Sequence, residues 1–296
     1  MSQSLALIGY ASGLAANNSG CGEGPLKLQA LHFERQLSRK GLESHWQAML
    51  TMPADSTTDR LTQVAELNKQ LAKITTQLTK RNQPFLVIGG DHSSAIGTWS
   101  GVAASILSRE DDALGLIWID AHMDSHTFDT TPSGNIHGMP LAALLGYGDV
   151  ALTEILTSQP KLKPEHVSLI GIRSFESEEA ALLNRLGVRI YEMPEIKQRG
   201  IRLVLQEAIA RAKKNTSGFG VSLDLDGIDP KDAPGVGVPE PDGIAGEDLC
   251  QALTLLQQET QLLGLEIVEY NPALDHDHKT EQLIQKLVLS IFGGKR

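Results

Sequence analysis

The sequence contains few cysteines and no excess of positive charge, and both absences exclude classes of protein. Only Cys21 and Cys250 occur among the 296 residues, far apart and without the spacing of metal ligands. A disulfide framework is therefore excluded, and a reducing compartment fits best. The 26 basic residues are outnumbered by 36 acidic ones, which gives a formal net charge of −10. That balance argues against nucleic acid or an anionic membrane as a partner.

Signal, membrane and linker segments are also missing. Met1–Ser4 carries no basic side chain, and the apolar run Leu5–Ile8 is too short for a signal or membrane helix. We therefore predict a cytoplasmic protein. No stretch rich in Pro, Ser or Gly, no internal repeat and no low-complexity segment divides the chain. We predict one domain over residues 1–296.

Apolar segments that alternate with helical patterns define the expected fold. Short apolar runs predict strands at Leu5–Tyr10, Phe85–Ile88, Leu114–Ile119, His166–Ile172, Val188–Tyr191, Phe219–Leu223 and Leu263–Val268. Helices are predicted over about residues 25–40, 59–81, 94–108, 139–145, 195–213 and 281–291, and loops over 11–24, 52–58 and 126–137. This order predicts the α/β class, with a doubly wound, mainly parallel sheet and helices on both faces.

Charged groups gather directly after the most apolar strand. Asp120, His122 and Asp124 follow Leu114–Ile119 within five residues. Charges at the end of a buried strand are costly unless they are compensated. A metal ion at the carboxyl edge of the sheet, where α/β sheets bind ligands, would satisfy all three. The alternative is a strand end whose Asp and His side chains cap a helix or pair with each other.

His92 follows another buried strand. Gly89 and Gly90 allow the backbone to turn sharply after Phe85–Ile88, which leaves His92 exposed at the carboxyl end of that strand. A histidine in this position can also be a plain loop residue. Its value as a candidate ligand therefore depends on the other strand ends.

A pair of carboxylates ends a third strand. Asp224 and Asp226 follow Phe219–Leu223, and the period of two places them on the same face of that strand. Two neighbouring carboxylates repel each other unless a cation lies between them. We interpret Asp229, which precedes Pro230, as a turn residue instead.

Together the three strand ends supply candidate ligands for a metal centre. They are His92, Asp120, His122, Asp124, Asp224 and Asp226. Four carboxylates with two imidazoles favour hard ions of high coordination number, and two Mn²⁺ ions fit best, with Co²⁺ or Fe²⁺ as substitutes. Two metals acting together can generate a hydroxide near neutral pH. Such a centre suits a cationic, planar electrophile better than an anionic phosphate ester.

The motifs Gly89–Ser93, Asp120–Asp124 and Ser222–Pro230 resemble those of the ureohydrolases, the family of arginases, agmatinases and their relatives. The similarity runs nearly the whole chain, from Glu23–Pro25 to Glu269–Pro272. It implies an arginase-like fold and a hydrolase that releases urea from a guanidino compound. It also implies a homo-oligomer, a trimer or a hexamer.

The same resemblance implies roles for the candidate residues. One manganese ion takes His92, Asp120, Asp124 and Asp224, and the other takes His122, Asp120, Asp224 and Asp226. Asp120 and Asp224 thereby bridge the ions, and Asp124 also holds a bridging hydroxide that attacks the guanidinium carbon. The tetrahedral intermediate collapses to urea and an amine. Glu269 pairs with the guanidinium, which a carboxylate suits because it can accept two N–H bonds, and His137 shuttles protons near the entrance.

The substrate is expected to be L-arginine, with L-ornithine as the second product. Thr131, Ser133 and Asn135 resemble the arginase residues that hold the α-carboxylate, and Glu176 resembles the carboxylate for the α-ammonium. His126 stands in the substrate-binding region where arginases usually carry Asn, and Val238 where they usually carry Thr. These departures keep an amidinohydrolase of another guanidino acid or of agmatine as the alternative.

Two further interpretations compete with a ureohydrolase. One is a non-catalytic family member that binds a metabolite or a partner subunit, but the complete ligand set argues against it. The other is the related fold of zinc deacetylases, which is disfavoured because the candidate ligands exceed the needs of one zinc ion.

Overall fold

A single parallel sheet organises the structure, a computed structural model that describes residues 4–52, 58–106 and 112–294. The sheet has eight strands in the order β2-β1-β3-β8-β7-β4-β5-β6, and every pairing is parallel. The strands are β1 (Leu5–Ala11), β2 (Ser44–Thr51), β3 (Phe85–Gly89), β4 (Leu114–Ile119), β5 (Val167–Ile172), β6 (Arg189–Glu192), β7 (Gly218–Asp224) and β8 (Leu262–Val268). The predicted α/β class and parallel sheet are confirmed.

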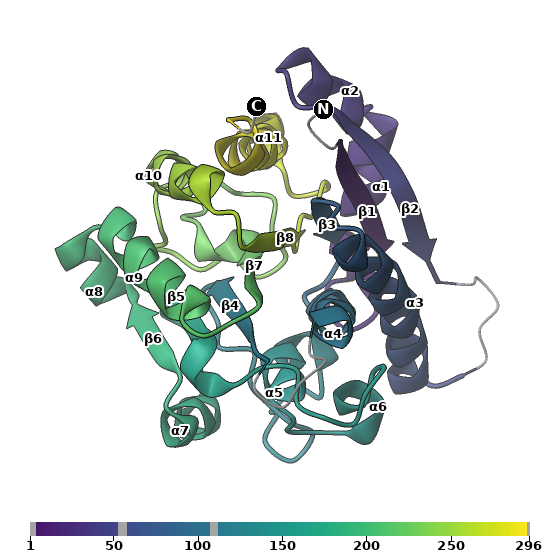
Figure 1. Ribbon diagram of the computed structural model, residues 1–296, viewed down its shortest axis with the longest axis vertical. Helices are drawn as coiled ribbons and strands as arrows, with labels where there is room; N and C mark the ends of the chain where they lie inside the picture. Colours follow the sequence, from purple (N-terminus) through teal and green to yellow (C-terminus); the bar gives the residue numbers. More distant parts are fainter. Residues whose placement is uncertain (1–3, 53–57, 107–111, 295–296) are drawn as a thin grey trace.

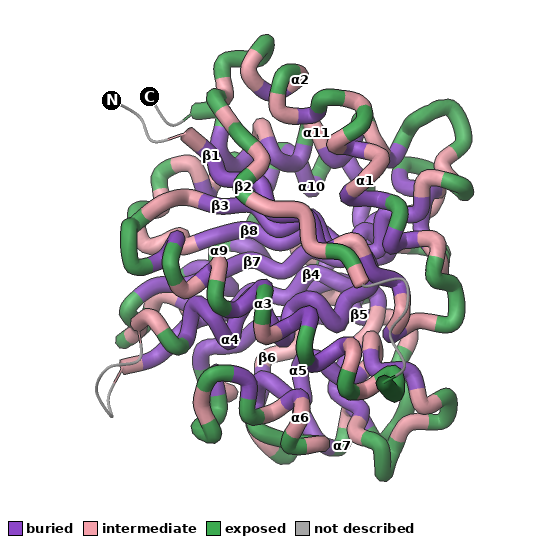
Figure 2. Tube along the Cα trace, turned by 90° about the vertical axis from the view of Figure 1, so that its right-hand side faces the viewer, coloured by how far each residue is buried: buried purple, intermediate pink, exposed green. Residues whose placement is uncertain are grey.

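Helices cover both faces of this sheet (Figure 1). The described helices are α1 (Glu23–Ala30), α2 (Phe33–Arg39), α3 (Arg60–Lys80), α4 (Ser94–Ile106), α5 (Pro140–Leu144), α6 (Val150–Thr153), α7 (Ser177–Leu186), α8 (Met193–Arg199), α9 (Ile201–Lys213), α10 (Gly246–Leu253) and α11 (Lys279–Phe292). In Figure 2 the central strands lie one beside another as a buried layer, and exposed segments lie around it.

Each face of the sheet has its own hydrophobic core, because side chains alternate along every strand. In β3, Leu86 and Ile88 pack into the core that also contains residues of α9, α10 and α11. Phe85 and Val87 point the other way, into the core with α3 and α4. All residues of β3, β4, β5 and β7 are buried, as parallel strands covered on both faces require.

Two predicted helices are each broken in two, and one strand was not predicted. The helix expected over residues 25–40 breaks at His32, whose φ of 54° is left-handed, so α1 and α2 are separate. The helix expected over residues 195–213 breaks at Gly200, with φ 82°, between α8 and α9. Strand β2 lies at the edge of the sheet and is only partly buried, so it lacks the continuous apolar run that reveals the inner strands.

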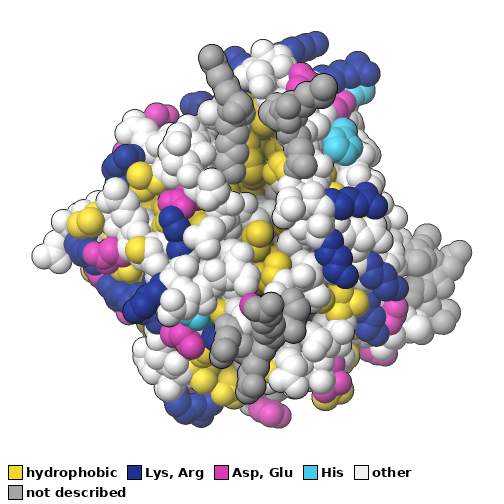
Figure 3. Space-filling view, viewed as in Figure 1, with side chains coloured by type: hydrophobic (Ala, Val, Ile, Leu, Met, Phe, Trp, Pro, Cys, Tyr) yellow, Lys and Arg dark blue, Asp and Glu magenta, His cyan; other side chains and the backbone are white. Residues whose placement is uncertain are grey.

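The surface of the protein carries charged side chains of both signs. Around the rim of the face in Figure 3, basic and acidic side chains both occur, so the net negative charge does not form one continuous acidic field there.

Within the described residues, no helix is long and apolar enough to cross a membrane. The loop predicted at residues 52–58 and the end of the helix predicted to residue 108 fall largely outside the described residues.

Candidate metal centre and substrate loop

The predicted metal ligands meet at the carboxyl edge of the sheet. Strands β3, β8, β7 and β4 are consecutive neighbours, so the segments that follow them converge. We call the side chains gathered there the strand-end cluster: His92, Asp120, His122, Asp124, Asp224 and Asp226. The cluster lies where α/β sheets usually bind ligands.

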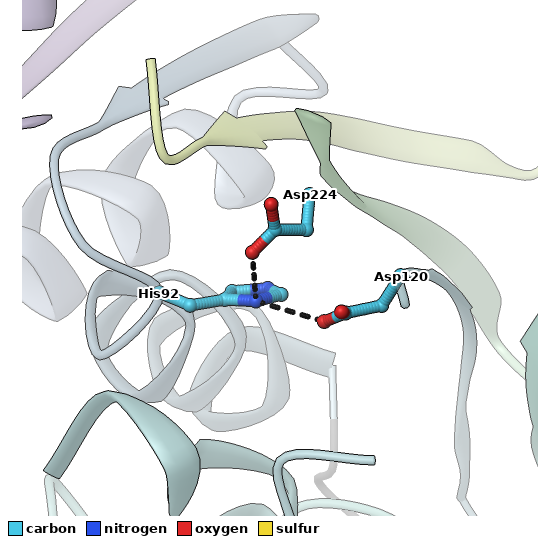
Figure 4. A group of neighbouring side chains, drawn as sticks. All are labelled: His92, Asp120 and Asp224. Carbon is cyan, nitrogen blue, oxygen red and sulfur yellow. Dashed lines mark ion pairs between the residues drawn. The ribbon is translucent and has the colours of Figure 1, made fainter. Parts of the chain in front are cut away.

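His92 lies at the centre of one half of this cluster, which we call the His92 group. Its Nδ1 atom is 3.2 Å from Asp120 Oδ2, 3.0 Å from Asp124 Oδ2 and 3.1 Å from Asp224 Oδ2. In Figure 4 the carboxylates of Asp224, the last residue of β7, and of Asp120, which follows β4, both point toward the same nitrogen of the His92 ring. Nδ1 is buried and has no hydrogen-bond partner with acceptable geometry among the described residues. A buried nitrogen that faces three carboxylates without a proper hydrogen bond fits a metal ligand.

A chain of hydrogen bonds orients the His92 ring from behind. Ser222 Oγ donates to Glu266 Oε2 at 2.9 Å, so its oxygen is left to accept the Nε2–H of His92 at 3.0 Å. This arrangement places the ring proton on Nε2 and leaves the lone pair of Nδ1 facing the carboxylates. The Trp118 ring also stacks on His92, with centroids 4.1 Å apart. Polar partners of this kind fix the orientation of metal-ligating histidines.

Glu266 itself is fully buried and held by hydroxyl donors. Ser94 Oγ and Thr98 Oγ1 donate to its Oε1 at 2.8 and 2.7 Å, in addition to the bond from Ser222. Burial raises the pKa of Glu266, and the hydroxyl donors and His92 partly offset that effect. Glu266 was not predicted from the sequence, because its role depends on its pairing with Ser222 across β7 and β8.

The other half of the cluster, the His122 group, contains His122, Asp120 and Asp226. The Nδ1 atom of His122 is 3.1 Å from Asp226 Oδ2 and 3.5 Å from Asp120 Oδ1. Asp120 therefore belongs to both groups, with one oxygen toward each. On the opposite side of the ring, Nε2 lies 3.7 Å from Glu240 Oε1, a carboxylate that also accepts a hydrogen bond from Ser174. Glu240 was not predicted, since it lies in a loop far along the chain.

The expected geometry of one carboxylate pair needs a correction. Asp224 is the last residue of β7, but Asp226 lies in a 3-10 turn, Leu225–Gly227, instead of two positions along a strand. The Asp226 N–H donates to Asp224 Oδ1 at 2.9 Å, and this bond shapes the turn. The turn, not the strand period, brings both carboxylates to the cluster. Asp229 accepts the Lys231 N–H, which fits its interpretation as a turn residue.

The charges of the cluster are poorly compensated by protein groups alone. Burial raises the pKa of Asp224 well above its usual range, and the neighbouring Asp226 and Asp120 carboxylates add to the effect. Burial likewise raises the pKa of Asp226 to about 6, although His122 opposes it. Burial disfavours a charged His92, yet the carboxylates of Asp120, Asp124 and Asp224 close to its Nδ1 atom raise its pKa. Dications would replace the protons that these shifts imply, and four carboxylates with two imidazoles fit hard ions such as Mn²⁺.

Glu269 and His137 lie beside the cluster. Glu269 follows β8 with a left-handed φ of 66°, a strained conformation for a residue other than glycine. Its Oε1 accepts the backbone N–H of His92 at 3.0 Å and lies 3.2 Å from His137 Nδ1. Burial opposes the ionised form of Glu269, but the contact with His137 and the bond from His92 lower its pKa overall. An ionised carboxylate next to the cluster can pair with a guanidinium.

The loop of residues 126–137, which we call the substrate loop, is shaped by its own hydroxyl groups. Thr131 Oγ1 accepts the N–H groups of Ser133 and Gly134, and Ser133 Oγ accepts the Asn135 N–H at 3.2 Å. The two hydroxyl oxygens also lie 3.4 Å apart, so one hydroxyl donates to the other and one hydroxyl proton remains for a ligand. Asn135 Oδ1 is buried without a hydrogen-bond partner among the described residues.

The other residues considered for substrate binding lie in different environments. His126 is buried and lies 3.0 Å from Glu176 Oε2, the carboxylate expected to hold an α-ammonium. Val238 is 42% exposed and has no polar side-chain atom to offer. The contact between His126 and Glu176 was not predicted from the sequence.

Known proteins similar to this chain include several arginases. The sequence model of the arginase family matches residues 3–293. Arginase from Bacillus caldovelox is 46% identical over 241 residues, which cover 81% of this chain and 79% of that protein. Arginase from Brevibacillus brevis is 39% identical over 301 residues, which cover 100% of this chain and 99% of that protein. The crystal structure of arginase from Bacillus subtilis matches with a TM-score of 0.90 and 37% identity, over 98% of this chain and 99% of that chain.

Proposed function

The chain belongs to the arginase family, and from this premise we propose that it is a manganese-dependent enzyme that hydrolyses L-arginine to urea and L-ornithine. The observation that carries the proposal is the buried Nδ1 atom of His92, which faces three carboxylates without a hydrogen bond. A bound cation would satisfy that arrangement while the aspartates stay ionised and the imidazole stays neutral.

The ligand assignments are part of the proposal. His92, Asp120, Asp124 and Asp224 would hold one manganese ion, and His122, Asp120, Asp224 and Asp226 the other. The position of Asp120 between the two histidines supports its bridging role. A pair of such ions, held by these residues, would supply hydroxide as the nucleophile near neutral pH. Mn²⁺ is preferred by the donor set, and Co²⁺ or Fe²⁺ would be substitutes.

The protein groups around the ions orient the reactants and move protons. Glu269 binds the guanidinium through its carboxylate, which the His92 N–H holds in place. Asp124 accepts a hydrogen bond from the attacking water and so directs it at the guanidinium carbon. As the C–N bond to the alkyl chain breaks, the leaving amine takes a proton, which His137 supplies from its place beside Glu269.

The substrate loop supports an amino acid as substrate. The hydroxyl groups of Thr131 and Ser133, together with Asn135, would hold an α-carboxylate, because one of the two hydroxyl protons is not used between them and the loop oxygens accept only backbone N–H groups. Glu176 would hold the α-ammonium, since its side chain is 54% exposed and can accept further hydrogen bonds. The exposed Val238, which offers no such bond, favours a second candidate, an amidinohydrolase of another guanidino compound.

Three further parts of the proposal concern domain organisation, compartment and assembly. One sheet takes strands from Leu5 to Val268, which supports a single domain over residues 1–296. Cys21 and Cys250 are both buried and unpaired, which fits a cytoplasmic protein. Assembly as a trimer or hexamer follows from the family alone. The complete set of candidate ligands argues against a non-catalytic member.

Urea release from a panel of substrates tests the function. Manganese-loaded protein is assayed with arginine, agmatine, 4-guanidinobutyrate and 3-guanidinopropionate at matched concentrations. Arginine should be faster by about tenfold or more, because each missing α-group leaves the polar side chains that would hold it unpaired. A guanidino acid without an α-amino group that is hydrolysed faster would refute the arginine assignment. No urea from any of them would refute the hydrolase.

A further inference from the structure

A histidine and two glutamates form a second polar group beside the strand-end cluster. His126 Nε2 lies 3.0 Å from Glu176 Oε2 and 3.5 Å from Glu179 Oε2. The side chains of His126 and Glu179 are 7% and 4% exposed, whereas that of Glu176 is 54% exposed. The exposed carboxylate therefore rests against a buried imidazole, with a buried carboxylate next to it.

Both buried members of this group are fixed by their surroundings. Glu179 accepts the Ser125 N–H through Oε1 at 3.0 Å and the Glu176 N–H through Oε2 at 3.2 Å. The second bond belongs to a capping box at the start of α7, in which Glu176 in turn accepts the Glu179 N–H. The His126 N–H donates to Gly138 O at 3.0 Å, which fixes the backbone beneath the ring.

Neither nitrogen of the His126 ring is free to bind a substrate. Nδ1 lies 3.1 Å from Thr130 Oγ1, and Nε2 is taken by Glu176 at 3.0 Å. An imidazole has only these two hydrogen-bonding atoms. Since the ring is almost completely buried, an α-carboxylate could reach it only by breaking one of these bonds.

We propose that His126 is a positioning residue that aims Glu176 at the substrate ammonium and makes no contact with the α-carboxylate. The inference rests on the proposed function. His126 and the capping box hold the Glu176 carboxylate in one orientation, so less rotamer freedom is lost when an ammonium binds. Recognition of the ammonium then depends on His126, and recognition of the carboxylate depends on the substrate loop.

Two arginine analogues separate these roles. Agmatine keeps the ammonium and lacks the carboxylate, whereas 5-guanidinopentanoate keeps the carboxylate and lacks the ammonium. Each is measured as a competitive inhibitor of arginine hydrolysis by the manganese-loaded enzyme, so the measurement holds whether or not the analogue is hydrolysed. The variants are His126→Ala, Glu176→Gln and the double variant.

For His126→Ala we expect the KM of arginine and the Ki of agmatine to rise by the same factor, about tenfold. The Ki of 5-guanidinopentanoate and the kcat for arginine should stay within about twofold. Glu176→Gln should act in the same way, and the double variant should be little worse than either single one, because the two side chains act as a unit.

Two milder substitutions keep the test decisive if His126→Ala folds poorly. Thr130→Val removes the partner of Nδ1 and retains the imidazole, so it should give a smaller change in the same direction. Glu178→Gln removes a neighbouring exposed carboxylate on the same helix and should change none of the constants. Elemental analysis should show the wild-type metal content in every variant.

Opposite outcomes would overturn the inference. A raised Ki for 5-guanidinopentanoate with an unchanged Ki for agmatine would mean that His126 contacts the α-carboxylate. An equal loss of kcat with all variants of the group, or lost metal, would mean a general structural role. A wild-type enzyme that releases urea from another guanidino compound, but not from arginine, would refute the proposed function and the inference with it.

Discussion

The strand-end cluster and the group around Glu176 differ most in how far they are removed from water. The His92, Asp120 and Asp224 side chains are 1%, 1% and 4% exposed, whereas that of Glu176 is 54% exposed. The cluster is fixed by four neighbouring strands, and Glu176 is held by a helix cap and one imidazole. Buried charges are costly without a partner, whereas exposed ones are weakly coupled to stability. The strand-end cluster should therefore control metal binding and chemistry. The group around Glu176 and the substrate loop should control the affinity for substrates and the choice among them.

The largest effect is expected from a bridging carboxylate. Asp224→Asn should lose both metal ions and lower kcat by about a thousandfold or more, because the source of the nucleophile is lost. Asp229→Asn is the matched control, since Asp229 lies on the same segment but caps a turn. Bound manganese and urea release should stay near wild type in the control. Retention of both ions by Asp224→Asn would contradict the bridging role.

Metal removal should destabilise the protein more as the pH rises. In the metal-free protein, the raised pKa of Asp226, about 6 against the ordinary 3.8, means that the folded state binds more protons between these values. Stability then falls as the pH rises through that window, and the raised pKa of His92 extends the fall above pH 6.5. The pKa of Asp120 is lowered instead, so its protonation changes the stability only at pH values below the ordinary 3.8.

Thermal unfolding with and without a chelator measures this linkage. The Tm difference between manganese-loaded and metal-free protein should be larger at about pH 7.5 than at about pH 5, because metal ions replace the bound protons. An equal Tm difference at both values would show that the carboxylates do not take up protons when the metal leaves.

A smaller effect, on manganese affinity, is expected from Glu266, which orients the His92 ring through Ser222. Glu266→Gln replaces an acceptor of three hydroxyl bonds by an amide that cannot accept all of them, so Ser222 loses its fixed orientation. Manganese affinity at the His92 group should fall about 10- to 100-fold. Thr98→Ser retains the hydroxyl group and should bind manganese as the wild type does. Metal titration followed by elemental analysis distinguishes the two, and unchanged affinity in Glu266→Gln would remove this residue from the account.

The smallest effect is expected in the substrate loop. Ser133→Ala removes one exposed hydroxyl group and should raise the KM of arginine by about fivefold, with kcat and metal content unchanged. Steady-state kinetics with arginine, beside metal analysis of the same sample, tests this. If kcat fell by the same factor as kcat/KM, the substrate loop would take part in the chemical step. The division of roles between this loop and the strand-end cluster would then be wrong.

The same contrast explains what the sequence could predict. The inner strands are continuous apolar runs, so the polar residues that end them, such as His92, Asp120 and Asp224, stand out and could be assigned to one edge of a sheet. Glu266 and Glu240 could not be found, because their roles depend on which strands and loops become neighbours. The left-handed residue His32 has no clear signal in the sequence, so α1 and α2 were predicted as one helix. For the same reason, the contact between His126 and Glu176, which are 50 residues apart, emerged only from the structure.

The metal content of the purified protein tests the central claim most directly. After loading with Mn²⁺ and extensive dialysis, elemental analysis of the wild type should show about two manganese ions per chain, as four carboxylates and two imidazoles require. The same measurement on His92→Ala should show the loss of mainly one ion, since the His122 group is intact. A single tightly bound zinc ion in the native protein, with no further manganese taken up, would contradict a dinuclear centre.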